Sequence, residues 1–210
     1  MNRQEEMAML SELQENYGRH GVVLFFGELT PEKAEHIRFW LMRLSLQYQG
    51  TQIKLIIDSR GGSVHHGLML VDLIQSLPKQ VIGIVNGECH SMAPVVLQAC
   101  SERIATKHSR FLLHNISYSP RYSLFDAQAR FDSDYKNLKR YQGQIIDILC
   151  GRSGLPPEKV IELITGGDVV EELHSSDMIC ELKLVDRVVE KFEMLGSIKK
   201  NKISVRKSRK

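Results

Sequence analysis

The feature that most constrains this chain is an alternation of apolar strands and helical segments along its first half. Short runs rich in Val, Ile, Leu and Phe, typical of buried strands, are separated by segments with the apolar spacing of a helix. Parallel strands need such crossover connections, whereas antiparallel strands can be joined by a tight hairpin. The sequence therefore predicts an α/β fold with a parallel-rich sheet and crossover helices. The expected strands cover residues 21–27, 53–58, 81–85, 103–105 and 111–114.

The expected helices include one that is too long for a small domain. Thr30 is expected to cap a helix over residues 31–46, with Pro31 at its first position, and a second crossover helix covers 64–77. Residues 123–150 predict a helix of about 42 Å, which would project and pack against another subunit. Beyond it we expect helices over 156–164 and 176–182 and short strands over 168–173 and 184–189.

The length of 210 residues suits one α/β core, with 42% apolar residues to fill it. We divide the chain into an N-terminal segment (1–20), a main domain (21–190) and a C-terminal tail (191–210). Residues 197–210 carry seven basic side chains and no acidic one. We favour a disordered, solvated tail over one that binds nucleic acid or an acidic surface.

The sequence also argues against a membrane protein and against a secreted one. No apolar run approaches the ~20 residues that span a bilayer, and no apolar core of a signal peptide follows the N-terminus. The cysteines are far apart and form no C-x-x-C pair, so we expect free thiols in a reducing cytoplasm and neither disulfides nor a zinc site. They are Cys89, Cys100, Cys150 and Cys180. We expect no membrane, nucleic-acid or metal partner.

Ser91 lies between the strand at 81–85 and a helix-compatible run that ends near Ala99. A serine at such a turn can be held in a fixed position, next to helix N–H groups that stabilise developing negative charge. Pro94 fits the first helical turn, where its missing N–H has no partner to lose. Taken alone, the pattern favours a helix cap over a nucleophile.

Three further features converge on Ser91. Gly61 and Gly62 follow the strand at 53–58, either as an ordinary turn or as backbone that approaches a ligand closely. His114 ends an apolar strand, where it is either a general base beside Ser91 or a core histidine bonded to backbone. An acidic cluster is a candidate to orient its imidazole. The cluster consists of Asp168, Glu171 and Glu172.

Four motifs, in this order and spacing, resemble the ClpP family of ATP-dependent serine proteases over residues 22–189. The Ser-Met-Ala and His-Asn forms resemble the phage-type and other divergent ClpP-like branches more than the housekeeping enzyme. The resemblance implies that Ser91 is the nucleophile and His114 the general base, and that the N–H groups of Gly62 and Met92 form the oxyanion hole. The motifs are Ile57-Asp58-Ser59-Arg60-Gly61-Gly62-Ser63-Val64, Gly87-x-x-x-Ser91-Met92-Ala93, Ser109-Arg110-Phe111-Leu112-Leu113-His114-Asn115 and Leu184-Val185-Asp186.

The resemblance also implies an architecture and partners. The subunit would have a crotonase/ClpP-like fold, and its long helix would be a handle between two stacked rings, usually heptamers. Peptides and unfolded proteins would be cleaved inside the chamber of this homo-oligomer. A AAA+ unfoldase would use the ATP, so that this subunit would need no cofactor.

The sequence departs from the family pattern at the acid of the catalytic triad. The family places an aspartate fifteen residues before Asp186, and this chain has Glu171 there. Asp168 has the right chemistry and follows the end of a predicted helix, so we favour Asp168 and keep Glu171 as the alternative. Arg60 and Lys183 replace a usual proline and glycine.

Two other functions compete with the protease. A catalytically inactive ClpP-like subunit would complete a mixed ring and dock a partner. An acyl-CoA enzyme of the crotonase superfamily would use Gly62 to hold a thioester enolate, but no feature of the sequence marks a CoA site.

Overall fold

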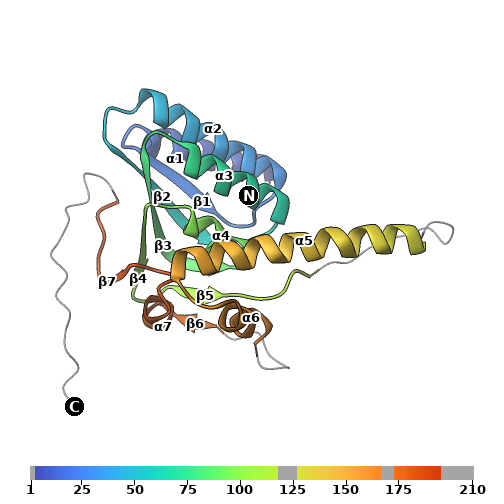
Figure 1. Ribbon diagram of the computed structural model, residues 1–210. Helices are drawn as coiled ribbons and strands as arrows, with labels where there is room; N and C mark the ends of the chain where they lie inside the picture. The colour runs from blue at the N-terminus through green and yellow to red at the C-terminus, as the bar shows by residue number, and fades with distance from the viewer. Residues whose placement is uncertain (1–2, 118–126, 167–172, 195–210) are drawn as a thin grey trace, which may run out of the picture.

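The centre of the molecule is a mainly parallel sheet covered by helices on both faces (Figure 1). The computed structural model describes residues 3–117, 127–166 and 173–194. The main path of the sheet runs in the order β1-β2-β3-β4-β7, and β5 and β6 extend it beside the far end of β3. The strands are β1 (Val22–Phe26), β2 (Gln52–Ser59), β3 (Gln80–His90), β4 (Glu102–Thr106), β5 (Arg110–Leu112), β6 (His174–Ser175) and β7 (Arg187–Val189).

The two faces of the sheet bury alternate side chains of each strand, as a pleated backbone requires. One face carries Val23 and Phe25 of β1 and is covered by α2 (Pro31–Gln47) and α3 (Val64–Ser76). The other face carries Val22 and Leu24 and is covered by α1 (Arg3–Gly18) and the segment that follows β7. Both faces are therefore buried, and the predicted α/β fold with crossover helices is confirmed.

The helix boundaries follow the capping chemistry of the sequence. The hydroxyl of Thr30 accepts a hydrogen bond from the N–H of Lys33 at the start of α2, and the hydroxyl of Ser175 does the same for Met178 at the start of α7. Three further helices are α4 (Met92–Gln98), α6 (Pro157–Thr165) and α7 (Ser176–Glu181).

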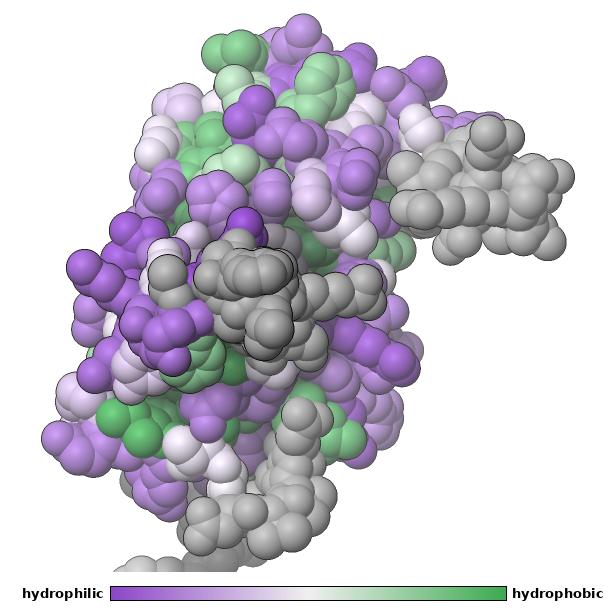
Figure 2. Space-filling model, turned by 90° about the vertical axis from the view of Figure 1, so that its right-hand side faces the viewer, coloured by the Kyte–Doolittle hydropathy of each residue, from purple (hydrophilic) through white to green (hydrophobic). Residues whose placement is uncertain are grey.

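The long helix α5 (Ala127–Ser153) has 27 residues and projects well beyond the sheet (Figure 1). Its C-terminal part belongs to the core through Ile145 and Leu149, whereas Phe131 and Tyr135 near its outer end are exposed. The view toward this outer end shows a mainly hydrophilic surface with separate hydrophobic patches (Figure 2). The predicted projection of this helix is confirmed.

β3 extends five residues beyond the end that the sequence pattern predicts, because Gly87 marks a bulge and not the end of the strand. Ile57 pairs with Val85 and Ser59 with Cys89, so β3 contains two extra residues between these pairs. A Cβ atom on Gly87 would lie 2.3 Å from Oδ1 of Asp58, so only glycine fits this position. Beyond the bulge, β3 pairs with β5 and continues to His90.

Other boundaries differ by a few residues. β5 ends at Leu112, two residues before His114. β7 begins at Arg187, after a turn in which Leu184 and Val185 are buried. Among the residues placed by the structure, no helix combines the length and the apolar character needed to cross a bilayer. Three predictions concern segments outside the described residues, namely the start of the long helix at 123–126, the strand at 168–173 and the tail at 197–210.

Candidate active site

Ser91 lies at the junction of β3 and α4 in a backbone conformation that is rare for any residue except glycine. Its dihedral angles are φ 58° and ψ −109°, and its N–H donates to the carbonyl of Leu112 at 2.8 Å. The serine occupies the N-cap position of α4, yet its hydroxyl makes no capping hydrogen bond. The cap interpretation of Ser91 is therefore wrong, and the hydroxyl is available for other chemistry.

Gly61 and Gly62 lie directly against this turn, in conformations that require glycine. Their φ angles are +81° and +143°. A Cβ atom on Gly61 would lie 2.6 Å from the nitrogen of Met92, and one on Gly62 would lie 2.6 Å from the carbonyl oxygen of Leu29. The glycine pair is thus an element of the site, and the interpretation as an ordinary turn is insufficient.

The backbone around Gly62 directs its N–H away from Leu29. Leu29 donates to the carbonyl of Gly61 at 2.7 Å and accepts from the N–H of Ser63 at 2.9 Å. Because the carbonyl of Gly61 and the N–H of Gly62 belong to one trans peptide group and point in opposite directions, the N–H of Gly62 faces the opposite side. Met92 is the first residue of α4, where helix N–H groups have no partner within the helix.

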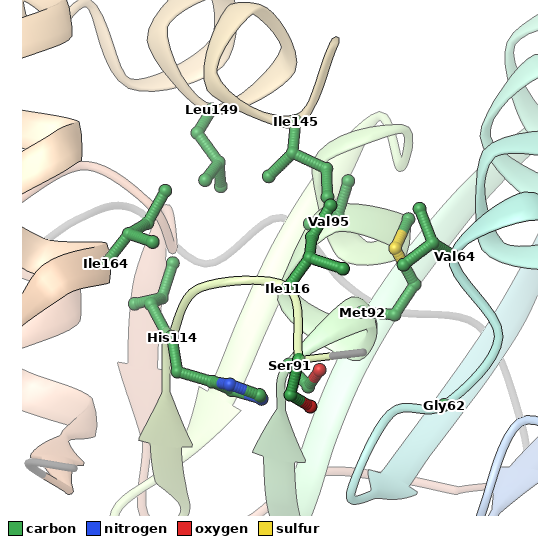
Figure 3. Close-up of a pocket in the computed structure, with 12 residues that line it drawn as sticks. Gly62, Val64, Ser91, Met92, Val95, His114, Ile116, Ile145, Leu149 and Ile164 are labelled. Atoms are coloured by element: carbon green, nitrogen blue, oxygen red, sulfur yellow. The ribbon is translucent and has the colours of Figure 1, made fainter. Parts of the chain in front are cut away.

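A partly open cavity of about 70 Å³ joins these groups to His114. Ser91, Met92, Gly62 and His114 all line it, and the imidazole of His114 points toward Ser91 (Figure 3). The described part of its wall contains no charged carboxylate, ammonium or guanidinium group. The apolar wall consists of Val64, Met92, Val95, Leu113, Ile116, Ile145, Leu149 and Ile164.

An open groove of about 520 Å³ begins at the same residues, Gly62, Ser91 and His114. In contrast to the cavity, its walls are charged. Arg60 Nε donates to Glu88 Oε2 at 2.8 Å, and Arg60 is highly exposed. The hydrogen bond from Arg60 and its charge hold the pKa of the Glu88 carboxyl below its usual range. Ser91 and His114 therefore lie where an apolar cavity meets a polar groove.

Comparison with known proteins assigns the chain to a family. The family model described as Clp protease matches residues 4–191. This chain belongs to the Clp protease family. The resemblance seen in the sequence is confirmed, and with it the ClpP/crotonase-like fold of the family.

Several curated members of the Clp protease family match most of the chain. ATP-dependent Clp protease proteolytic subunit 3 of Rhodococcus jostii is 30% identical over 178 residues, which cover 83% of each chain. Proteolytic subunit 1 of Chlamydia caviae is 29% identical and covers 82% of this chain and 88% of its own. The proteolytic subunit of Cyanophora paradoxa is 33% identical over 141 residues, which cover 65% of this chain and 71% of its own.

The acid expected in a Clp protease triad falls outside the described residues, which are interrupted between Gly166 and Leu173. Asp168, Glu171 and Glu172 all lie in this interruption. The choice of Asp168 over Glu171 therefore stays a prediction.

The cysteines of this Clp protease homologue carry free thiols. Burial holds the pKa of Cys89 well above its usual value and raises the pKa of Cys100 to about 12, so both thiols are protonated at neutral pH. Within the described residues no three His, Cys, Asp or Glu side chains are grouped as metal ligands.

The sequence did not predict the residues that hold the C-terminal end of α4 against β4. Arg103 is buried, and its guanidinium donates to both carboxylate oxygens of Asp186. Arg103 also donates to Gln98 Oε1 at 2.5 Å, and Gln98 in turn donates to the carbonyls of Pro94 and Leu184. Arg103 thus ties β4 to α4, and Asp186 of the Leu-Val-Asp motif holds Arg103 in place. The sequence signal for this role is slight, namely the place of Arg103 at the start of the expected strand at 103–105.

Proposed function

We propose that this protein is a serine endopeptidase subunit that cleaves peptides and unfolded proteins by acyl transfer. The observation that carries the proposal is the strained turn at Ser91, whose hydroxyl makes no capping bond and faces the imidazole of His114. Strain of this kind costs about 1–3 kcal/mol and is typical of functional sites.

The reaction needs only groups around Ser91. His114 accepts the proton of the Ser91 hydroxyl as its oxygen attacks the scissile carbonyl carbon. The carbonyl oxygen becomes an oxyanion, which accepts hydrogen bonds from the N–H groups of Gly62 and Met92, each worth about 3 kcal/mol. The intermediate collapses, the C–N bond breaks, and His114 gives its proton to the departing amine.

A water molecule completes the cycle. His114 takes a proton from this water as its oxygen attacks the acyl carbon bound to Ser91. Collapse of the second intermediate releases the new carboxyl group, and the proton returns to Ser91. Asp168, with Glu171 as the alternative, would hold the imidazole of His114 in the required orientation. The mechanism uses no cofactor in this subunit.

The apolar cavity beside Ser91 would receive the substrate side chain on the acyl side of the cleaved bond. A charged side chain there would lose its hydration without gaining a partner, whereas an aliphatic one gains by burial. We therefore expect cleavage after apolar residues.

The assembly is also part of the proposal. The relatives are named as ATP-dependent proteolytic subunits. We propose that copies of this chain form stacked rings, with α5 as the handle between them and heptamers as the usual ring. A AAA+ unfoldase would feed polypeptides into the chamber. Because free thiols persist in reducing compartments, we propose a cytoplasmic location.

A fluorophosphonate probe tests the nucleophile directly. We expect the assembled wild type to be labelled and to hydrolyse an apolar peptide, and Ser91→Ala to lose both. Ser76→Ala, an exposed serine on α3, is the matched control and should behave as wild type. If the assembled wild type is not labelled, the protein is instead an inactive structural subunit of a mixed ring.

A further inference from the structure

Ser63 and His66 form a side-chain pair at the start of α3. Ser63 is the N-cap residue, and its hydroxyl lies 2.8 Å from Nδ1 of His66, the third residue of the helix. An N-cap serine usually accepts a hydrogen bond from a backbone N–H of the first turn, but Ser63 makes no such bond. The hydroxyl is therefore committed to the imidazole of His66.

This pair holds the residue that follows Gly62. Glycine has the greatest conformational freedom of any residue, so a fixed direction for its N–H requires that both neighbouring peptide groups be held. Leu29 holds them from one side, through the carbonyl of Gly61 and the N–H of Ser63. On the side of α3, Nδ1 of His66 holds Ser63 through a hydrogen bond with the Ser63 hydroxyl.

We infer that His66 is a positioning residue for the reaction, because its bond to Ser63 fixes the direction in which the N–H of Gly62 meets the oxyanion. The inference rests on the proposed function. Neither His66 nor Ser63 is among the described residues that line the cavity or the groove, so His66 acts through Ser63 and does not touch the substrate.

Three variants separate positioning from simple stability. His66→Phe keeps a ring of similar size but removes Nδ1, whereas His66→Asn keeps a polar atom at the position of Nδ1. His65→Phe is the matched control. His65 is exposed and is the neighbour of His66, and its ring packs edge-on against the ring of His66. Hydrolysis of an apolar peptide by the assembled protein is measured, with kcat and KM determined separately, together with the thermal midpoint.

We expect His66→Phe to lower kcat about tenfold, less than the ~10²–10³-fold loss of a whole oxyanion donor, because the N–H of Gly62 is misdirected but still present. KM and the thermal midpoint should stay near wild type. His66→Asn should recover most of kcat, and His65→Phe should match wild type. Ser63→Ala combined with His66→Phe should be no slower than either variant alone, since both remove the same bond.

Two results would overturn the inference while the proposed function stands. One is a fully active His66→Phe variant in a background where Ser91→Ala is inactive. The other is a loss in His66→Phe that moves kcat, KM and the thermal midpoint together and is not recovered by His66→Asn. A wild type without hydrolysis that depends on Ser91 would overturn the proposed function itself, and this inference with it.

Discussion

At Ser91 the fold keeps a single residue in a conformation that isolated chains avoid. β3 on one side and the fully buried helix α4 on the other hold this turn, and the space beside it is occupied by the backbone of Gly61. Such an arrangement leaves room for no additional atom. The turn therefore requires a glycine at position 61 for steric reasons, just as the proposed chemistry requires a serine at position 91.

Gly61→Ala tests this requirement. The new Cβ atom would lie 2.5–2.7 Å from the carbonyl of His90, the nitrogen of Met92 and Cβ of Ser91, on a backbone with φ +81°. We expect at least a hundredfold loss of peptide hydrolysis, since a shift of ~1 Å at a reacting group has this effect, and a loss of about 2 kcal/mol in unfolding free energy. Fluorophosphonate labelling rates and urea unfolding measure the two effects.

Gly143→Ala is the matched control for that experiment. Gly143 lies inside α5, where an added Cβ atom meets nothing within 4 Å. Alanine is favoured over glycine by up to about 1 kcal/mol in a helix, so the control should be active and slightly more stable. Equal activity of Gly61→Ala and Gly143→Ala would contradict the close approach of Gly61 to Ser91.

At the scale of single residues, the sequence predicted that Ser91, His114 and the glycine pair lie together, but not the backbone strain at Ser91. Serine, histidine and the glycine pair carry chemistry that can be recognised without coordinates. The φ angle of Ser91 and the bond between Ser63 and His66 depend on how neighbouring strands and helices meet, which no local pattern contains.

At the scale of elements, α4 lies between the candidate active site and the half-buried ion pair of Arg103 and Asp186. Burial acts to raise the pKa of the Asp186 carboxyl, but hydrogen bonds and the charge of Arg103 outweigh it, and the net pKa lies below the usual range. Ionised Asp186 therefore stabilises the fold above its pKa in the unfolded chain, ~3.9. This stabilisation is lost as the pH falls through the lower pKa of the folded state.

Asp186→Asn should lower the unfolding free energy by about 2 kcal/mol at pH 7. Breaking a fully buried pair costs ~3–5 kcal/mol, and the loss is smaller here because the side chain of Asp186 is 38% exposed. The difference from wild type should shrink when the pH falls below ~4, where the wild type also loses the charge. Urea unfolding at several pH values measures both quantities; a difference independent of pH would contradict the ion pair.

The wall of the cavity should decide which apolar residue precedes the cleaved bond. Ile145→Ala would enlarge the cavity at the base of α5. We expect the ratio of kcat/KM for phenylalanine over leucine at that position to rise about tenfold, with a stability loss of roughly 2–4 kcal/mol. Competing peptide substrates measure the ratio. Ile161→Ala, an exposed isoleucine on α6, should leave it unchanged.

The elements themselves were largely predictable, because apolar periodicity and capping residues are local signals. The end of β3 was not, because a glycine in a sequence marks a turn or a bulge equally well. The cavity wall was also missed, since Ile145 and Ile164 come from helices far along the chain and reach Ser91 only through tertiary packing.

At the scale of the whole molecule, α5 carries an aromatic surface, formed by Phe131 and Tyr135, that the described residues leave largely exposed. The rings of Phe131 and Tyr135 stack on one another at 6.4 Å, and both are more than half exposed. Aromatic residues on a projecting helix are typical of a contact between protein chains. The proposed handle would use this surface.

Charges introduced on this surface should prevent ring stacking. We expect the double variant Phe131→Asp and Tyr135→Asp to sediment as a smaller species with unchanged helical content by circular dichroism, because an interface does not bury unpaired carboxylates. Asn137→Asp adds a like charge to an exposed position of the same helix and should assemble normally. A double variant with the wild-type sedimentation coefficient would exclude this surface from the assembly.

One rigid helix thus carries both Ile145, in the wall beside Ser91, and Phe131, on the outer surface. A substrate side chain that displaces this helix as it fills the cavity would also displace the outer surface. Binding equilibria coupled in this way are reciprocal, so that each ligand changes the affinity of the other by the same factor. A peptide whose apolar side chain fills the cavity would then lower the subunit concentration at which rings associate. Substrate would in this way act as an effector of its own enzyme's assembly.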